Sequence, residues 1–221
     1  MLLTRRWGRL SLSAGRDNCP SQRSLRVNDV TAFVLAGGKS SRMGSDKAFL
    51  PWQGGTLLSH ALNLAAAVTD QVRIVGDAGK FAGFGTVIED VYRECGPLGG
   101  IHAALSHTTT RWNLVLAIDL PFLEPRFLEY LIQRAQEAES EVTVPRAAGG
   151  FQPLCAVYRS EFAAVAEHSL RAGKHKIDLL FAPTRTRVIE QKELESDGFS
   201  SEMFRNLNTP EDLQQATQDH P

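Results

Sequence analysis

Short apolar runs alternate with amphipathic segments along most of this chain. The apolar runs predict strands that are buried on both faces, and they cover residues 30–35, 72–75, 86–88 and 113–118. Apolar residues that recur every three or four positions predict helices, and these cover residues 57–68, 98–105 and 124–137. This alternation predicts an α/β fold, in which right-handed crossovers join parallel strands and helices cover both faces of the sheet.

The first predicted helix has a clear start and a clear apolar face. Thr56 is a favourable capping residue directly before it. The apolar face that we expect to cover the sheet consists of Leu57, Leu58, Ala61, Leu62, Ala65 and Val68.

The second half of the chain continues with shorter elements. We predict strands at 141–145, 153–158 and 186–189, and helices at 161–170, 177–181 and 211–217. Thr209 and Pro210 suit the start of the last helix, as a capping residue and a first-turn proline. The strand that ends near Glu190 is a candidate for an antiparallel orientation. Residues 29–221 are expected to form one domain, because α/β domains of roughly 200 residues commonly stay undivided.

The first 28 residues differ from the rest in composition. They contain six arginines, several serines and a single acidic residue, Asp17. This composition fits an organellar transit peptide. It also fits a disordered extension, which we favour because the apolar residues are too few and scattered to form a core.

Charge and cysteine content narrow the possible environments. The chain has 24 basic and 25 acidic residues, so we expect neither nucleic-acid nor membrane binding. Its three cysteines have no metal-ligand spacing, and their odd number argues against a disulfide framework and for a reducing cytoplasm. No apolar run reaches the roughly 18 residues that a membrane helix needs.

A glycine-rich, basic loop follows the first predicted strand at residues 36–47, and a turn at 51–55 closes it. Glycines allow backbone N–H groups to approach an anion, and Lys39, Arg42 and Lys47 add positive charge, so the loop predicts nucleotide binding. It is not a Walker A loop, because Phe33 occupies the position of that motif's first glycine. The dinucleotide-binding fingerprint is also absent.

Four segments resemble one known family. Residues 35–47 read Leu-Ala-Gly-Gly-Lys-Ser-Ser-Arg-Met-Gly-Ser-Asp-Lys, which is similar to the signature loop of the molybdenum cofactor guanylyltransferases. In the family's order follow Gly-Pro-Leu-Gly-Gly-Ile at 96–101, Ala-Ile-Asp-Leu-Pro-Phe at 117–122 and Asn-Leu-Asn-Thr-Pro-Glu-Asp-Leu at 206–213. The resemblance covers about residues 30–216. It implies a three-layer, Rossmann-like nucleotidyltransferase fold with a mostly parallel sheet.

The resemblance also implies an activity, namely transfer of GMP from GTP to the molybdopterin cofactor with release of pyrophosphate. Molybdoenzyme apoproteins and other cofactor-synthesis proteins are candidate further partners. Cytidylyl transfer to the same cofactor is an alternative. A non-catalytic GTP-binding or docking module is another.

Three residues are the candidates for catalysis. Asp119 follows a buried strand, and the pattern alone fits a Mg²⁺ ligand as well as a turn-capping carboxylate; the resemblance implies the magnesium ligand. It also implies that Lys47 binds the triphosphate. Arg42 could bind phosphate oxygens or pair with Asp46.

The remaining candidates would bind the two substrates. By resemblance, the nucleotide contacts are Leu35, Ala36, Gly37, Gly38, Lys47, Asp90 and Asp119, although Asp90 could also be a simple turn residue. Asn206 and Asn208 alternate, so in an extended chain they would share a face and could bond a polar acceptor such as a pterin. The same segment could instead be only the entry to the last helix.

Overall fold

A computed structural model describes residues 29–37, 46–207 and 209–219 of the chain. The expectations for residues 1–28 and for Gly38, Lys39, Arg42 and Asn208 lie outside these ranges. None of the helices within them is long and apolar enough to cross a membrane.

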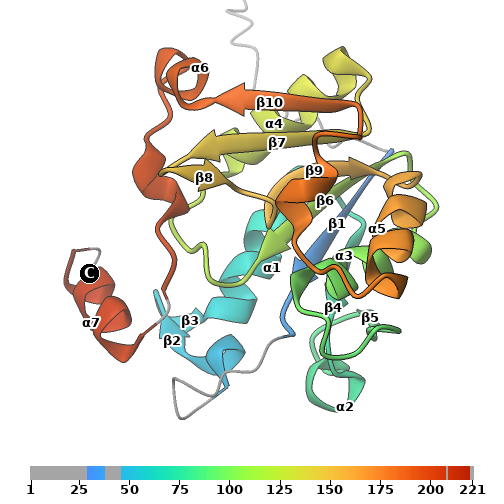
Figure 1. Cartoon of the computed structure of the whole chain (residues 1–221). Coiled ribbons are helices and arrows are strands. Elements are labelled where there is room, and N and C mark those ends of the chain that lie inside the picture. The colour runs from blue at the N-terminus through green and yellow to red at the C-terminus, as the bar shows by residue number, and fades with distance from the viewer. Residues whose placement is uncertain (1–28, 38–45, 208, 220–221) are drawn as a thin grey trace, which may run out of the picture.

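The described residues form one eight-stranded sheet with the strand order β10-β7-β9-β6-β1-β4-β5, and β8 pairs with β7 at one end (Figure 1). The strands are β1 (Val30–Leu35), β4 (Val72–Val75), β5 (Val87–Ile88), β6 (Trp112–Ala117), β7 (Val142–Ala147), β8 (Gly150–Phe151), β9 (Cys155–Arg159) and β10 (Thr186–Glu190). All the strands predicted from the sequence are therefore present, with ends that differ by two residues or fewer. The sheet is mostly parallel, as predicted.

The strands that run antiparallel to the rest are β8 and β9, and not β10. β9 runs antiparallel to both β6 and β7, whereas β10 pairs parallel with β7. The expectation of an antiparallel strand near Glu190 is therefore wrong. The chain reverses between β7 and β8 in a two-residue turn, where Ala148 and Gly149 both have positive φ, and such a short connection permits only antiparallel pairing. β9 continues in the reversed direction. β10 then starts at the same end of the sheet at which β9 ends, and it runs along β7 as the outermost strand.

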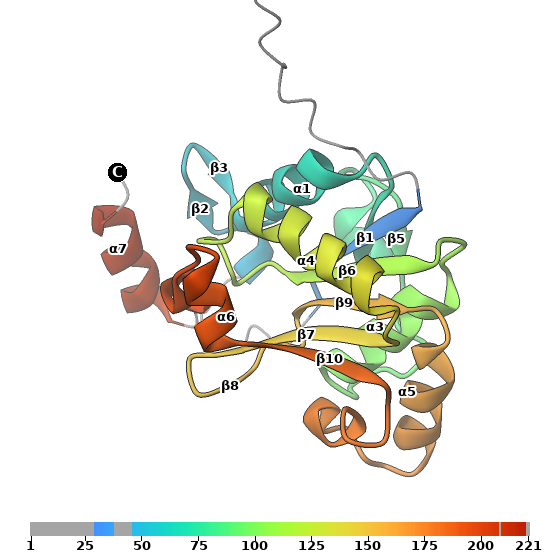
Figure 2. The same cartoon turned by 90° about the horizontal axis from the view of Figure 1, so that it is seen from above.

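Helices cover both faces of the sheet, so the three-layer architecture is confirmed. One face carries α1 (Leu57–Val68), α4 (Pro125–Ala138) and the short α6 (Gln191–Ser196), and the other carries α3 (Pro97–Ser106) and α5 (Phe162–Arg171) (Figure 2). Alternate residues of β1 divide between the two cores: Val34 packs with α1 and α4, whereas Phe33 and Leu35 pack with α3.

The crossovers do not all have one hand. From β1 through α1 to β4 the chain moves one way along the sheet, and from β6 through α4 to β7 it moves the other way, yet α1 and α4 lie on the same face. The crossover from β5 to β6 also moves in the second direction, but its helix α3 lies on the opposite face. The α4 crossover therefore has the opposite hand to the other two, and the prediction of uniformly right-handed crossovers is wrong.

α1 starts as its sequence predicts. The Ser59 backbone N–H donates to Thr56 Oγ1 at 3.1 Å and the Thr56 N–H donates to Ser59 Oγ at 2.8 Å, which completes a capping box. The predicted turn before it is a hairpin of β2 (Pro51–Trp52) and β3 (Gly55–Thr56). Leu64 is buried on the inner face of α1, whereas Leu62 is only partly buried.

The remaining elements are short. α2 (Ala78–Phe81) lies between β4 and β5, and the described part of the chain contains three 3-10 helices: η1 (Lys47–Phe49), η2 (Ile177–Leu180) and η3 (Ser201–Phe204). The chain continues into α7 (Pro210–Asp219). Thr209 and Asp212 cap α7 reciprocally, with Thr209 N to Asp212 Oδ2 at 2.8 Å and Asp212 N to Thr209 Oγ1 at 3.1 Å.

Gly99 allows α3 to approach the loop that precedes it. A Cβ atom at this position would lie 2.7 Å from the backbone oxygen of Tyr92, which cannot move away as a flexible side chain could. We expect Gly99→Ala to lower the free energy of unfolding by about 1 kcal/mol or more, because overpacking outweighs alanine's better helix propensity. Urea denaturation measures this. Gly83→Ala is the matched control, since nothing lies within 4 Å of its Cβ position, and an equal loss there would refute the explanation.

Candidate active site

The reversal of strand order at the centre of the sheet predicts a crevice for a ligand there. β1 and β6 are parallel neighbours with the register Val30↔Trp112 to Leu35↔Ala117. After β1 the chain moves toward β4, and after β6 it moves toward β7 on the other side. In open α/β sheets, ligands bind outside the carboxyl ends of strands where the strand order reverses in this way.

Two predicted site residues meet at this crevice. Asp119 lies just beyond the end of β6, and Lys47 begins η1 after the loop that follows β1. Lys47 Nζ lies 3.1 Å from Asp119 Oδ2, and the two side chains are 15% and 25% exposed. The contact joins residues 72 positions apart in the chain. A cation and a carboxylate, both largely shielded from water, thus face each other at the carboxyl end of the sheet.

The end of η1 nearest the crevice is fixed by its own cap. Asp46 precedes η1, and its Oδ1 accepts a hydrogen bond from Ala48 N at 3.2 Å. Its other carboxylate oxygen accepts from Lys80 Nζ at 2.8 Å. Ala48 is fully buried. The cap on Ala48 N and the burial of Ala48 hold Lys47 at the start of a short, anchored helix.

Backbone groups at the end of β1 face β4. The N–H groups of Ala36 and Gly37 both donate to the carbonyl oxygen of Val75, at 3.0 and 3.2 Å. A Cβ atom at Gly37 would lie 3.7 Å from Gly76 Cα, so the two strand ends run close together. Because these N–H groups already have an acceptor, any backbone contact to a nucleotide here has to use carbonyl oxygens or a different conformation.

Asp90 lies on the β4–β5 side of the crevice. Its side chain is half-buried, and its Oδ1 is buried without a hydrogen-bond partner within the described residues. The Cβ position of Gly100 lies 3.8 Å from that oxygen and 3.4 Å from Leu35 Cδ2, so Asp90 and Leu35 meet beside α3. Burial raises the pKa of the Asp90 carboxyl above its usual range, against a smaller opposing effect of His102. A buried acceptor without a donor suits a ligand that brings N–H groups.

The segment before α7 also lies next to the crevice. Leu207 N donates to the backbone oxygen of Asp119 at 3.1 Å. The neighbouring Asn206 is exposed beside the end of β6, where the acceptor was predicted to bind. The capping of α7 by Thr209 confirms that this segment is the entry to the last helix, whereas acceptor binding by Asn206 stays a prediction.

The chain matches the MobA-like NTP transferase domain over residues 32–186. It belongs to this family. It is 34% identical over 189 residues to the "Probable molybdenum cofactor guanylyltransferase" of Pelotomaculum thermopropionicum, covering 84% of this chain and 91% of the relative. It is 31% identical over 187 residues to the "Molybdenum cofactor guanylyltransferase" of Syntrophotalea carbinolica, covering 83% and 89%.

Solved structures agree with this assignment of the MobA-like chain. Molybdopterin-guanine dinucleotide biosynthesis protein A from Archaeoglobus fulgidus superposes with a TM-score of 0.76 at 28% identity, over 86% of this chain and 97% of that protein. A CMP:2-keto-3-deoxy-manno-octonic acid synthetase complexed with CTP superposes with a TM-score of 0.66 at 14% identity, over 86% and 97%. The latter likeness concerns the fold alone.

The donors in this MobA-like site suit Mg²⁺. No group of three or more histidine, cysteine, aspartate or glutamate side chains gathers anywhere in the described ranges. Transition-metal sites built from several protein ligands need such a group. Mg²⁺ needs only one or two carboxylates, because substrate phosphates and water complete its coordination. Asp119, whose Oδ2 already faces a cation, fits that requirement.

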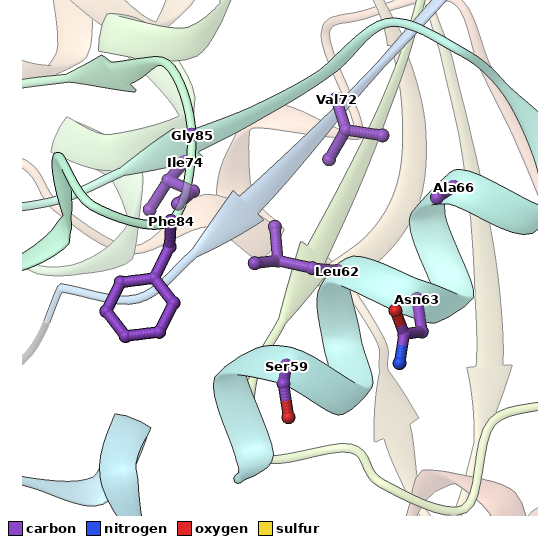
Figure 3. A pocket seen from close by; sticks show the side chains of 8 residues that line it. All are labelled: Ser59, Leu62, Asn63, Ala66, Val72, Ile74, Phe84 and Gly85. Atoms are coloured by element: carbon purple, nitrogen blue, oxygen red, sulfur yellow. The ribbon is translucent and has the colours of Figure 1, made fainter. Parts of the chain in front are cut away.

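An apolar hollow elsewhere on the MobA-like domain does not fit a nucleotide. It has a volume of about 320 Å³ and lies between α1, β4 and the loop before β5. In Figure 3, Leu62 points from α1 toward the strands, and Phe84 and Ile74 stand on the other side. None of the residues that line it is charged, so it offers nothing to neutralise a triphosphate.

Proposed function

We propose that the protein transfers GMP from GTP to molybdopterin and releases pyrophosphate. The observation that carries this proposal is the contact between Lys47 and Asp119 at the carboxyl ends of β1 and β6. Supporting it, curated guanylyltransferases resemble the chain over more than four fifths of its length. We also propose molybdopterin and GTP as its substrates on this basis.

The reaction needs positioning and charge stabilisation, but no protein nucleophile. A phosphate oxygen of molybdopterin attacks the α-phosphorus of GTP, and the bond to the pyrophosphate oxygen breaks. Lys47 would contact the triphosphate oxygens and stabilise the negative charge that develops on the leaving group. Asp119 would hold Mg²⁺, which when bound supplies further neutralisation of that charge. Arg42, which lies outside the described residues, stays a predicted phosphate ligand.

Asp90 is proposed to bind the guanine or ribose of GTP through its buried oxygen. Asp90→Asn is then expected to raise the KM for GTP about tenfold or more, because hydrogen bonds to charged groups contribute about 1.5–3 kcal/mol. Steady-state kinetics at saturating acceptor measure this change. An unchanged KM for GTP would contradict the role.

The same substitution is expected to stabilise the free protein at neutral pH. Burial raises the pKa of Asp90 in the folded state, so the folded protein binds its proton more tightly than the unfolded chain does. Stability then falls as pH rises from the ordinary aspartate pKa of about 4 to the raised value. Asp90→Asn removes this loss. In urea denaturation, its free energy of unfolding should therefore exceed that of the wild type at pH 7, and the difference should vanish below about pH 4.

Pyrophosphate release from GTP, CTP, ATP and UTP, each with Mg²⁺ and molybdopterin, tests the proposed function. Release with GTP alone is expected. Release with CTP would assign the chain to cytidylyl transfer. GTP binding without turnover would favour a docking module, in which case Asp119→Ala should leave its function unchanged.

Two further expectations belong to this proposal. Product transfer to molybdoenzyme apoproteins, or contact with other cofactor-synthesis proteins, would follow the reaction. The cytoplasmic location inferred from the cysteine content also stays a prediction.

A further inference from the structure

A hollow of about 570 Å³, lined by both polar and apolar residues, opens beside the end of β6. Its walls come from the β2–β3 hairpin, α1, the start of α4 and the segment that contains η3. This volume lies within the range of roughly 300–1,000 Å³ that is usual for small-molecule sites. The residues used below are His60, Phe122, Glu124, Glu202 and Arg205.

Two walls of the hollow lie close to Asp119, one through the sequence and the other through a backbone hydrogen bond. On one side, Pro121 lines the hollow two residues after Asp119. On the other, Arg205 lines it two residues before Leu207, whose N–H bonds the Asp119 backbone oxygen at 3.1 Å. Because two residues of extended chain span at most about 7 Å, each wall begins within that reach of the catalytic crevice.

One wall carries a cationic aromatic surface. The Phe122 ring packs edge-on against Trp52, with centroids 5.5 Å apart and an interplanar angle of 88°. The Arg205 guanidinium carbon lies 4.4 Å from the centroid of the Phe122 ring. A flat heteroaromatic ring could stack on either group, and Arg205 would attract an anionic substituent.

A second wall is held by His60 on α1. His60 Nε2 lies 2.9 Å from the backbone oxygen of Pro121, and because a carbonyl oxygen only accepts, Nε2 carries the proton. Burial lowers the pKa of His60, against a smaller opposing effect of this hydrogen bond. The contact fixes α1 against the segment that leads from Asp119 into α4.

The exposed carboxylates of Glu124 and Glu202 complete the lining. A carboxylate can accept two parallel hydrogen bonds from adjacent N–H donors. The 2-amino-4-oxo-pyrimidine edge of a pterin presents two such donors. The candidate nucleotide ligand, Asp90, lies beyond β1 in the direction of β4 and β5. The hollow lies on the face of the sheet that α1 and α4 cover.

We propose that this hollow binds the pterin portion of the acceptor. The ring stacks against Phe122 and Arg205, Glu202 accepts hydrogen bonds from its amino edge, and the phosphate substituent extends past Pro121 toward Asp119. This inference rests on the proposed guanylyl transfer, because it names the site of that reaction's second substrate. It assigns acceptor recognition to residues beyond Asn206 and Asn208.

Glu202→Gln and Phe122→Leu test the proposal in the full-length protein. Fluorescence titration with 6-hydroxymethylpterin, in the presence of GTP and Mg²⁺, is expected to show at least about tenfold weaker binding for Glu202→Gln, the usual contribution of a charged hydrogen bond. For Phe122→Leu we expect about two- to tenfold weaker binding, the usual contribution of an aromatic contact. The KM for molybdopterin should rise similarly while the KM for GTP stays constant. Asp90→Asn should show the reverse pattern. Glu195→Gln, on the exposed side of α6, is the matched control for the carboxylate.

Two outcomes separate this inference from the proposed function. If the wild type converts GTP and molybdopterin but Glu202→Gln and Phe122→Leu keep wild-type pterin affinity and KM, the pocket assignment is overturned. If pterin binding depends on both residues yet no nucleotide is turned over, the assignment stands as a pterin site and guanylyl transfer fails. Thermal unfolding of Glu202→Gln should match the wild type, because this side chain is exposed.

Discussion

Asp119→Ala is expected to reduce kcat/KM for GTP-dependent pyrophosphate release by about a thousandfold or more, since the loss of a group that acts on transition-state charge costs about 4 kcal/mol. The carboxylate lies at the carboxyl end of β6 with Lys47 Nζ at 3.1 Å. Removing it would leave Lys47 without this partner and Mg²⁺ without its proposed protein ligand. Release of pyrophosphate in a coupled assay measures the loss.

A control for Asp119→Ala is available on α4. Glu137→Gln removes a carboxylate whose partner is Arg134, 3.0 Å away, in a half-exposed pair. Exposed pairs contribute about 0–1 kcal/mol, so this variant should keep full activity and nearly full stability. If Asp119→Ala retained more than a tenth of wild-type activity, the aspartate would have a structural role instead.

The second large effect is expected for Lys47→Met. This side chain is proposed to contact the triphosphate, so its loss should lower kcat/KM by roughly a hundredfold to a thousandfold, the range found for single charge-stabilising donors. Both kcat and the affinity for GTP should fall, because Lys47 meets phosphate oxygens in the ground state and in the transition state. Steady-state kinetics together with direct GTP titration separate the two contributions.

Lys80→Met is the matched control for this lysine. Lys80 is more exposed than Lys47, and its ammonium pairs with Asp46 at 2.8 Å. The cap that Asp46 forms on Ala48 N uses its other carboxylate oxygen, so it does not require Lys80. Its removal should change activity by less than a factor of about two, consistent with the small contribution of surface ion pairs. Equal losses in the two variants would mean that net positive charge near the loop, and not the position of Lys47, determines activity.

Much of the fold could be predicted because an apolar run bounded by polar residues is compatible with few kinds of secondary structure. The runs at 30–35 and 72–75 coincide with β1 and β4, and Thr56 caps α1 as its sequence indicates. The short elements α2, α6 and η3 were not predicted. A helix of four to six residues is too short for its apolar residues to repeat, so local patterns do not identify it.

Strand direction and crossover hand depend on contacts that local patterns do not contain. The tight turn at Ala148 and Gly149 sends the chain back along β7, and β9 then occupies the place between β6 and β7. The crossover through α4 has to pass over β9 to reach β7. Neither fact follows from the hydrophobic periodicity of β9 or β10, which is the same for either direction.

The sequence could predict those site residues that follow a predicted strand or its loop. The pattern placed Asp119 at a strand exit and Lys47 after a loop, and the structure brings them into contact. The hollow beside β6 was not predicted, because residues such as His60, Phe122 and Glu202 come from separate segments and form no motif in the sequence. Proximity of this kind is produced only by the tertiary fold.

The pairing of β1 has a consequence for synthesis of the chain. β1 lies between β4 and β6, and its register with β6 joins residues about eighty positions apart (Figure 1). Until residues 112–117 have left the ribosome, one edge of this fully buried strand has no partner. Exposed strand edges promote aggregation, and non-local pairing slows folding. A nascent or truncated chain that ends before Trp112 should therefore depend on chaperones, whereas a chain extending past Ala117 can close the centre of its sheet.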